Sequence, residues 1–183
     1  MTSATATETS QYLTFTIGAE QFGADILRVK EIIQYDHVTR IPHLPPSIRG
    51  VINLRGGIVP VVDLAVKFLG AERPVTPSTC IVIVETEHDG VESVMGVIAD
   101  SVSEVVSFAA EDVEPAPEFG TAIRVDFLHG LGKVGKSFVL ILDINRVLAY
   151  DVLFAAEAIA AVAEPASESA EGASIPDAAL AAE

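Results

Sequence analysis

Two oppositely charged residues stand among apolar neighbours, and their side chains are suited to recognition chemistry. Arg55 lies in the turn Arg55-Gly56-Gly57, and Glu31 lies in the segment Leu27–Tyr35. A guanidinium that meets a carboxylate forms a charge-assisted pair, which holds the arginine rigid for a partner. The alternative is an exposed ion pair that contributes only ~0–1 kcal/mol to stability. An arginine at a glycine turn beside apolar residues is also typical of an interface hot spot.

The geometry of this pair depends on the conformation of Leu27–Tyr35. In a strand, Val29, Glu31 and Ile33 share one face, so that two apolar side chains flank the carboxylate within reach of Arg55. In a helix, Leu27, Lys30 and Glu31 would group together instead. The sequence leaves both conformations open.

A glycine-rich loop from Gly130 to Gly135 matches the pattern G-x-G-x-x-G and is followed by Lys136. A dinucleotide site needs these glycines at the start of a helix, because the phosphates rest on the helix N-terminus. Here an apolar strand, Phe138–Leu142, follows. We therefore expect a hairpin loop, and a nucleotide-binding barrel that uses this loop is the remote alternative.

The remaining reactive residue types form no active-site pattern. The four histidines (His37, His43, His88, His129) show no ligand spacing, and no serine lies in a G-x-S-x-G elbow. Cys80, inside an apolar run, is the only cysteine. Asp63 and Asp143 precede short apolar segments, where a carboxylate caps a helix. We expect no catalytic residue, no metal site, no cofactor and no enzymatic activity.

The chain is organised around a hairpin from Arg49 to Leu64. Two β-branched runs, Val51–Leu54 and Ile58–Leu64, flank the turn, and the glycines are expected to supply its positive-φ positions. Further expected strands are residues 12–17, 22–26, 80–86, 93–98, 101–108, 123–128 and 138–142. Short helices are expected at 65–70, 144–149 and 151–163.

The two halves of this pattern resemble each other. Phe22-Gly23, Val29, Glu31 and Ile32 recur 73 positions later as Met95-Gly96, Val102, Glu104 and Val105. Gly50, Ile58, Val59, Val61, Val62, Asp63 and Leu64 recur 80 positions later as Gly130, Phe138, Val139, Ile141, Leu142, Asp143 and Ile144. Gly135, however, stands at the place of Arg55, which favours partner recognition over fold maintenance for the arginine. We predict an all-β fold of two small barrel subdomains packed together, with a groove at their junction for a partner's helix or strand.

Composition limits the partners and the compartment. The formal net charge of the 183 residues is −15, so a nucleic acid partner is disfavoured. Residues 1–10 are polar and lack a charged, apolar leader, and no apolar stretch approaches the ~20 residues of a membrane span. These features favour a cytoplasmic protein without direct membrane insertion. Residues 1–10 and the acidic Ala/Ser/Glu/Pro-rich residues 165–183 are expected to be disordered.

Three segments strongly resemble the CheW family of bacterial chemotaxis coupling proteins. They are Ile48–Leu64 (IRGVINLRGGIVPVVDL), Phe22–Ile32 (FGADILRVKEI) and Pro115–Phe119 (PAPEF), and the likeness covers about Gln11 to Leu153. The family has two SH3-like five-stranded β-barrel subdomains and no catalytic activity. The resemblance implies subdomains at about 11–75 and 76–150, intertwined at their edges, followed by a helix at 154–164.

The resemblance also implies a function and a binding site. CheW proteins couple chemoreceptors (methyl-accepting chemotaxis proteins) to the regulatory domain of the histidine kinase CheA, in arrays clustered at the membrane. By match to family positions and their neighbours, the candidate receptor- or kinase-binding residues here are Val29, Glu31, Ile33, Arg55, Gly56, Val102 and Val105. A CheW-like scaffold in a non-flagellar chemosensory pathway would share all of these residues and is the alternative.

Overall fold

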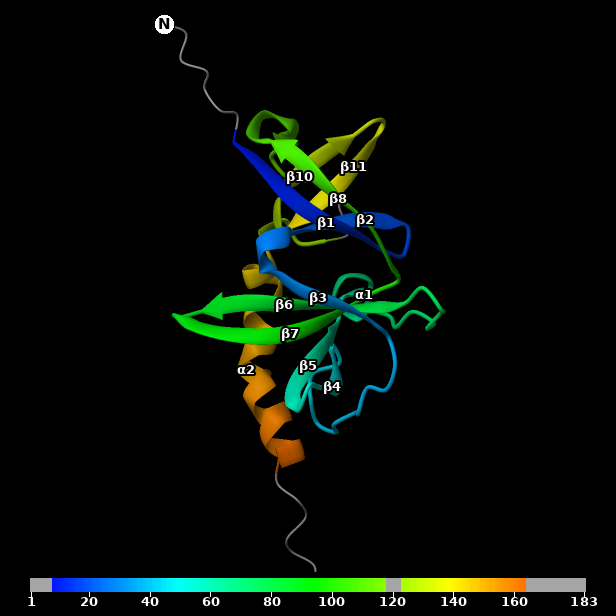
Figure 1. The fold of residues 1–183 in the computed structure, drawn as a ribbon, viewed down its shortest axis with the longest axis vertical. Coiled ribbons are helices and arrows are strands. Elements are labelled where there is room, and N and C mark those ends of the chain that lie inside the picture. Colours follow the sequence, from blue (N-terminus) through cyan, green and yellow to red (C-terminus); the bar gives the residue numbers. More distant parts are fainter. Residues whose placement is uncertain (1–7, 118–122, 164–183) are drawn as a thin grey trace, which may run out of the picture.

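The computed structural model describes residues 8–117 and 123–163 (Figure 1). Within them, two curled sheets lie one above the other, and a long helix runs along the lower one. The strands are β1 (Thr9–Ile17), β2 (Glu20–Asp25), β3 (Val29–Gln34), β4 (Ile48–Leu54), β5 (Gly57–Asp63), β6 (Cys80–His88), β7 (Val91–Ala99), β8 (Ser101–Ala109), β9 (Val113–Glu114), β10 (Leu128–Val134) and β11 (Ser137–Leu142). The helices are α1 (Leu64–Leu69) and α2 (Ile144–Ala163), with 3-10 turns η1 (Ile26–Arg28), η2 (Ala110–Asp112) and η3 (Val125–Phe127).

The strands form two sheets of related order. Sheet A has the order β8-β1-β2-β11-β10-β9, and sheet B has the order β3-β6-β7-β5-β4. A bridge between Thr39 and Val51 extends sheet B beyond β4, as β9 extends sheet A beyond β10. The predicted all-β fold of two SH3-like barrels is confirmed.

The two sheets do not coincide with the two halves of the sequence. Strands β1 and β2 join β8–β11 in sheet A, whereas β6 and β7 join β3–β5 in sheet B. Each half therefore gives its first hairpin to the other half's barrel. The expected division near residue 75, with the subdomains intertwined at their edges, describes the halves of the sequence, and the two sheets exchange a hairpin between those halves. The physical reason is that the parallel pairs β2–β11 and β5–β7 join strands from different halves.

The strand registers support the internal duplication. Gly23 pairs with Ile141 in sheet A, and Gly96 pairs with Val61 in sheet B, so that repeated residues meet repeated partners. A Cβ atom added to Gly96 would lie 2.7 Å from Ile81 Cγ2. The glycine is needed because a neighbouring side chain packs directly over its backbone.

The largest hydrophobic cluster lies between the sheets. This inter-sheet core draws on sheet A, sheet B and both helices, with Phe15, Phe22, Val84, Met95 and Leu148 fully buried. Two smaller clusters belong to the single sheets: one is formed by Ile52, Val59, Val61, Ile81, Ile83 and Ile98 of sheet B, the other by Tyr12, Phe108, Val139 and Ile141 of sheet A. The shared core joins the barrels into one body.

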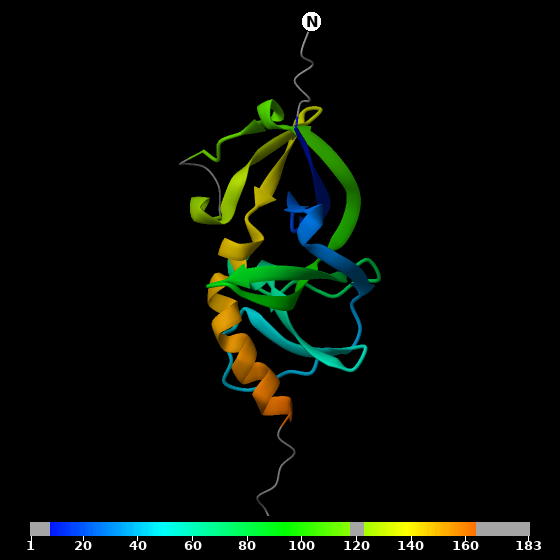
Figure 2. The same cartoon turned by 60° about the vertical axis from the view of Figure 1, so that its left-hand side comes forward.

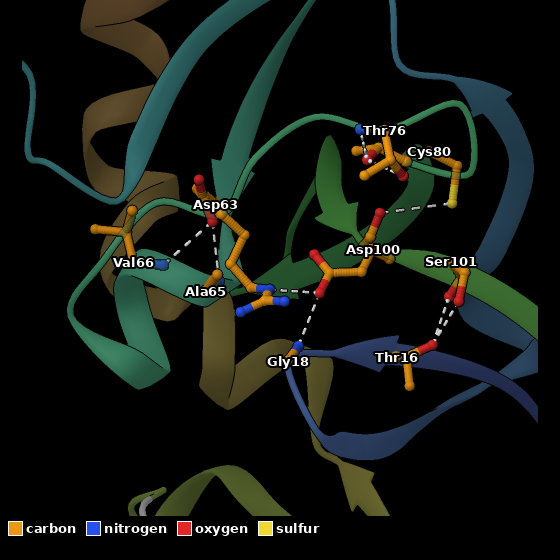
Figure 3. A network of polar contacts seen from close by, with 12 residues as sticks. Thr16, Gly18, Asp63, Ala65, Val66, Thr76, Cys80, Asp100 and Ser101 are labelled. Atoms are coloured by element: carbon orange, nitrogen blue, oxygen red, sulfur yellow. Dashed lines mark hydrogen bonds and ion pairs between the residues drawn. The ribbon is translucent and has the colours of Figure 1, made fainter.

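Polar contacts fix the crossing from β7 to β8 (Figure 3). Asp100 accepts hydrogen bonds from the backbone N–H of Gly18 at 2.8 Å and from Nε of Arg73 at 2.6 Å, and the hydroxyls of Thr16 and Ser101 contact each other. The bond from Gly18 attaches the crossing to the β1–β2 turn of sheet A, and the bond from Arg73 attaches it to the connection between α1 and β6. They therefore help to set the position of β8.

The helix caps follow the predicted pattern. Oδ1 of Asp63 accepts hydrogen bonds from the N–H groups of Ala65 and Val66 at the start of α1, as Figure 3 shows, and α1 ends at Gly70 with φ 75°. Asp143 likewise accepts from the N–H of Arg146. The capping roles of both aspartates are confirmed.

Helix α2 is one continuous element where the sequence predicts two (Figures 1 and 2). Asp151, which lies where the second helix was expected to begin, is fully buried and hydrogen-bonded to Ser47. Ala155 and Ala158 are buried as well, so the packed unit extends beyond the expected limit at Leu153.

Within the described residues, no helix has both the length and the apolar character required to cross a membrane. Residues 1–7 and 164–183, most of the expected disordered ends, lie outside the described residues, as does the end of the PAPEF segment.

Candidate functional site

The turn between β4 and β5 presents Arg55 to solvent. Leu54 pairs with Gly57, so Arg55 and Gly56 are the two turn residues, with φ of 52° and 86°. Two positive φ values are typical of a type I′ turn. The expectation that glycines supply both positions is wrong, because Arg55 itself takes the first. Asn53 Oδ1 accepts a hydrogen bond from the N–H of Gly56 at 3.0 Å and stabilises this turn.

The predicted pair of Glu31 and Arg55 is present. Arg55 Nη2 donates to Glu31 Oε2 at 2.9 Å, so the β4–β5 turn contacts β3 at the other edge of sheet B. We call the barrels formed by sheets A and B barrel A and barrel B, and the surface formed by Glu31, Arg55 and Gly56 the mouth of barrel B. The contact is a single hydrogen bond, and the Arg55 side chain is 79% exposed. Such a pair adds at most ~1 kcal/mol to stability, so its geometry suits presentation of the guanidinium better than maintenance of the fold.

The expected common face of Val29, Glu31 and Ile33 holds for Glu31 and Ile33 but not for Val29. Val29 lies opposite Val84 of β6, and Glu31 lies opposite the adjacent residue, Ile83. Since adjacent strand residues face opposite sides, Val29 and Glu31 also face opposite sides. The cause is a bulge at Lys30, which inserts one extra residue into β3. Ile33 packs against the cluster of sheet B, and Val29 packs against the inter-sheet core.

The same bulge recurs in β8 of sheet A. Val102 lies opposite Phe15, and Val105 lies opposite Leu13. These two positions are three residues apart on β8 but two residues apart on β1, so β8 contains one extra residue. On β3, Val29 and Ile32 lie opposite Val84 and Val82 in the same way. These partners belong to the inter-sheet core, so all four side chains point to the side of their sheet that carries it; Val29 and Val102 pack against the core, whereas Ile32 and Val105 are exposed. We call Val29, Ile32, Val102 and Val105 the inter-sheet apolar edge.

The seven predicted residues thus fall on two surfaces. Val29, Val102 and Val105 belong to the inter-sheet apolar edge, and Glu31, Arg55 and Gly56 lie at the mouth of barrel B. Ile33 shares the face of Glu31 and packs against the cluster of sheet B. Sequence reasoning missed Ile32, which is 44% exposed; Val105, its counterpart in the repeat, is 46% exposed. The signal that identifies it is the repeat itself, which pairs Ile32 with Val105. Leu27, in the connection from β2 to β3, is also highly exposed.

The glycine-rich segment at Gly130 lies in the β10–β11 hairpin, but only Gly135 and Lys136 form the turn, and the preceding residues belong to β10. The expected strand at residues 123–128 is wrong, because η3 lies within that range and the strand begins at Leu128. A Cβ on Gly130 would lie 2.7 Å from the carbonyl oxygen of Glu114, and one on Gly132 would lie 2.4 Å from the ring of Phe108. These glycines are explained by close packing within barrel A rather than by a phosphate. In the part of the chain that the structure describes, no three His, Cys, Asp or Glu side chains are grouped to hold a metal.

A buried ionic network was not anticipated from the sequence. The side chain of Arg49 is 8% exposed and donates to Asp63, whose carboxylate also caps α1. Burial disfavours the charged guanidinium, but the hydrogen bond and the attraction to Asp63 and Glu72 prevail, so the pKa of Arg49 lies above its ordinary value.

Burial also raises the pKa of the Cys80 thiol, which keeps it protonated and inert at neutral pH.

Comparison with known proteins identifies the family. The model of the CheW-like domain matches residues 11–152, nearly the whole described part of the chain. The chain belongs to the CheW-like domain family. "Chemotaxis protein CheW" of Klebsiella aerogenes is 41% identical over 138 residues, covering 75% of this chain and 81% of that protein. "Chemotaxis protein CheW" of Treponema pallidum is 33% identical over 144 residues, covering 76% and 82%.

A solved structure shares the fold. The crystal structure of the scaffolding protein TtCheW from Thermoanaerobacter tengcongensis superposes with a TM-score of 0.70 at 30% sequence identity. The match covers 81% of this chain and 93% of the other. The two-barrel arrangement of the CheW-like domain is therefore common to both proteins.

Proposed function

We propose that this protein is a non-enzymatic chemotaxis adaptor that couples chemoreceptors to the histidine kinase CheA. The family membership supports the proposal, as do the chemotaxis and scaffolding names of the relatives. The observation on which it chiefly rests is structural: one rigid body presents two distinct surfaces of the kind that proteins recognise. An adaptor needs both, because it must bind two partners at once.

The first surface is the inter-sheet apolar edge. Val29 and Val102 are half-buried on the core, whereas Ile32 and Val105 expose their side chains beside them. Exposed apolar residues beside a packed core suit the apolar face of a partner helix. In our proposal this edge receives the hairpin tip of a receptor's cytoplasmic coiled coil.

The second surface is the mouth of barrel B with Arg55, Gly56 and Glu31. Glu31 holds one nitrogen of the guanidinium, while the remaining donors point to solvent. In our proposal this surface meets the regulatory domain of CheA. The receptor and the kinase then influence each other through the fixed geometry of the shared core. The protein would work in the cytoplasm, clustered at membrane receptor arrays and without nucleic acid or a cofactor.

Substitution of Arg55 tests the second surface. Arg55→Ala should leave stability within about 1 kcal/mol of the wild type, because the pair is exposed. It should at the same time reduce receptor control of kinase autophosphorylation in an array reconstituted from purified receptor fragments, kinase and this protein. Arg124→Ala is the matched control, since Arg124 is similarly exposed and paired with a neighbouring carboxylate, that of Asp126. Unchanged kinase control with Arg55→Ala would remove the role assigned to this residue.

Substitution of Val105 tests the first surface separately. Val105→Glu places a charge on the inter-sheet apolar edge and should weaken co-sedimentation with receptor fragments at least about tenfold, as expected for a charge in an apolar contact. Val91→Glu is the control, because Val91 is a more exposed valine at the β6–β7 turn. Equal binding by both variants would contradict the assignment.

Coupling to a different chemosensory pathway would appear in a pull-down as another set of receptors, whose binding depends on the same residues of this protein.

A further inference from the structure

A surface pocket of about 410 Å³ lies beside α1, away from both proposed partner surfaces. Six apolar residues from the segment between β3 and β4, from the start of β4 and from α1 help to line it: Ile41, Leu44, Pro45, Pro46, Ile48 and Val66. Two guanidinium groups, those of Arg40 and Arg49, also line it. Apolar walls with convergent charged donors are the usual composition of a binding pocket.

The two arginines already hold a carboxylate. Arg40 Nη2 lies 3.3 Å from both carboxylate oxygens of Glu72, and Arg49 Nη1 lies 2.9 Å from Glu72 Oε2. Glu72 belongs to the exposed connection between α1 and β6 and is itself about half exposed. It therefore contacts the arginines from the solvent side and shows which chemical group the pocket accepts.

The donor set is built into the fold. Arg49 is nine-tenths buried, and Asp63 fixes its other amino group while capping α1. The guanidinium is thus pre-oriented, with one edge directed toward the pocket. A second carboxylate would find the same donors without rearrangement of Arg49 if Glu72 moved into solvent.

The chain contains an acidic segment that follows α2. Residues 164–183 hold five carboxylates and no Lys or Arg, together with the apolar residues Ile175 and Leu180. They follow directly on α2, whose C-terminal half passes beside the segment between β3 and β4 in both ribbon views (Figures 1 and 2). Ser47 of that segment bonds to Asp151 of α2. A linker of this length, 20 residues, would span about 25 Å on average as a random coil, and more when extended.

We propose that the acidic C-terminal segment docks into the pocket of Arg40 and Arg49, where one of its carboxylates replaces Glu72. Charge complementarity, the apolar residues on both sides and a tether long enough to reach the pocket favour this occupant. Tethering supplies a local concentration in the millimolar range, so that even a weak contact is substantially populated. The docked segment would cover the segment between β3 and β4, and any acidic partner that uses the pocket must displace it.

Paramagnetic NMR on the full-length chain tests the proposal. A nitroxide attached at Ala170→Cys is site-selective, because the native Cys80 is buried. We expect the amide signals of residues 40–49 and 66–72 to lose intensity about twofold, as for a tethered contact that is half populated. Arg40→Gln should restore them, since Arg40 is mostly exposed and its loss leaves the buried Arg49–Asp63 pair intact. Glu72→Gln should increase the effect, because it removes the competing carboxylate.

The controls separate docking from other causes. Arg124→Gln, at an exposed arginine outside the pocket, should leave the signal loss unchanged. In ~0.5 M NaCl the loss should diminish, because the Debye length falls to about 4 Å. Signal loss around Lys133 and Lys136 instead of the pocket would overturn the proposal, as would loss that persists with Arg40→Gln. Loss seen only when labelled and unlabelled chains are mixed would assign the pocket to a second copy and also overturn it.

Discussion

Arg55 occupies a backbone conformation that side chains other than glycine and asparagine rarely adopt. With φ of 52° it takes the first position of the β4–β5 turn, and its counterpart in the other barrel is Gly135 with φ of 60°. The left-handed conformation costs an ordinary residue about 1–2 kcal/mol. The fold thus accepts a strained residue where a glycine would serve, and strain of this kind concentrates at functional sites.

Replacement of Arg55 by asparagine should separate stability from function. Arg55→Asn relieves the strain, because asparagine tolerates positive φ and forms good I′ turns with a following glycine. It also removes an ion pair worth ~0–1 kcal/mol. We expect an unchanged or higher melting temperature, by up to about 2–4 °C per kcal/mol gained, together with impaired kinase control. Calorimetry would check the first result, and a marked fall in melting temperature would show that Arg55 maintains the turn.

Among the elements, α2 connects the two barrels. It leaves sheet A directly after β11 and then packs along β4, β5 and β6 of sheet B (Figure 2). Its fully buried Asp151 pairs with Lys67 of α1 and accepts a hydrogen bond from Ser47 at 2.9 Å. Lys67 in turn lies over the ring of Phe127, in η3. Three elements from both barrels therefore meet at one carboxylate.

Loss of this carboxylate should be costly. Asp151→Ala leaves the Lys67 ammonium largely buried without its partner, which typically destabilises a protein by about 3–5 kcal/mol. Urea denaturation should show this loss. The double variant Lys67→Met/Asp151→Leu should recover most of it, because an apolar pair of similar size avoids the buried charge. A double variant no more stable than Asp151→Ala would mean that packing, rather than the unpaired charge, causes the loss.

For the whole molecule, the exchange of hairpins makes each half depend on the other. Sheet A cannot close without β1 and β2 from the first half, and sheet B cannot close without β6 and β7 from the second. The two proposed partner surfaces are held at a fixed separation by the inter-sheet core. Relative movement of the barrels would require that core to open.

Truncations should locate the end of the packed unit. A chain that ends at Ala163 should keep nearly its full stability, because it retains all the buried residues of α2. A chain that ends at Leu153 loses the buried Ala155 and Ala158, and their methyl groups alone account for roughly 1–2 kcal/mol. Thermal denaturation of the two proteins, with the full chain beside them, checks this. Equal stability would place the end of the unit at Leu153, as the sequence predicted.

The sequence alone was sufficient for the local elements and for the candidate pair. Alternating β-branched residues, the turn glycines and the capping aspartates predicted the hairpins and α1, because these features act over a few neighbouring residues. The repeat predicted two similar barrels, and it also contained the equivalence of Ile32 and Val105. The charge and apolar setting of Glu31 and Arg55 predicted their contact, which the structure confirms.

Only the tertiary structure decided how these parts combine. The parallel pairs β2–β11 and β5–β7 join residues far apart in the chain, and no local pattern encodes which half supplies the partner strand. The bulge at Lys30 reversed the side to which Val29 points, because one extra residue inverts the alternation of a strand. The network of Arg49, Asp63 and Glu72 likewise arises where three separate segments meet. Long-range packing assigned these side chains to surfaces, while local sequence determined the strands and turns that hold them.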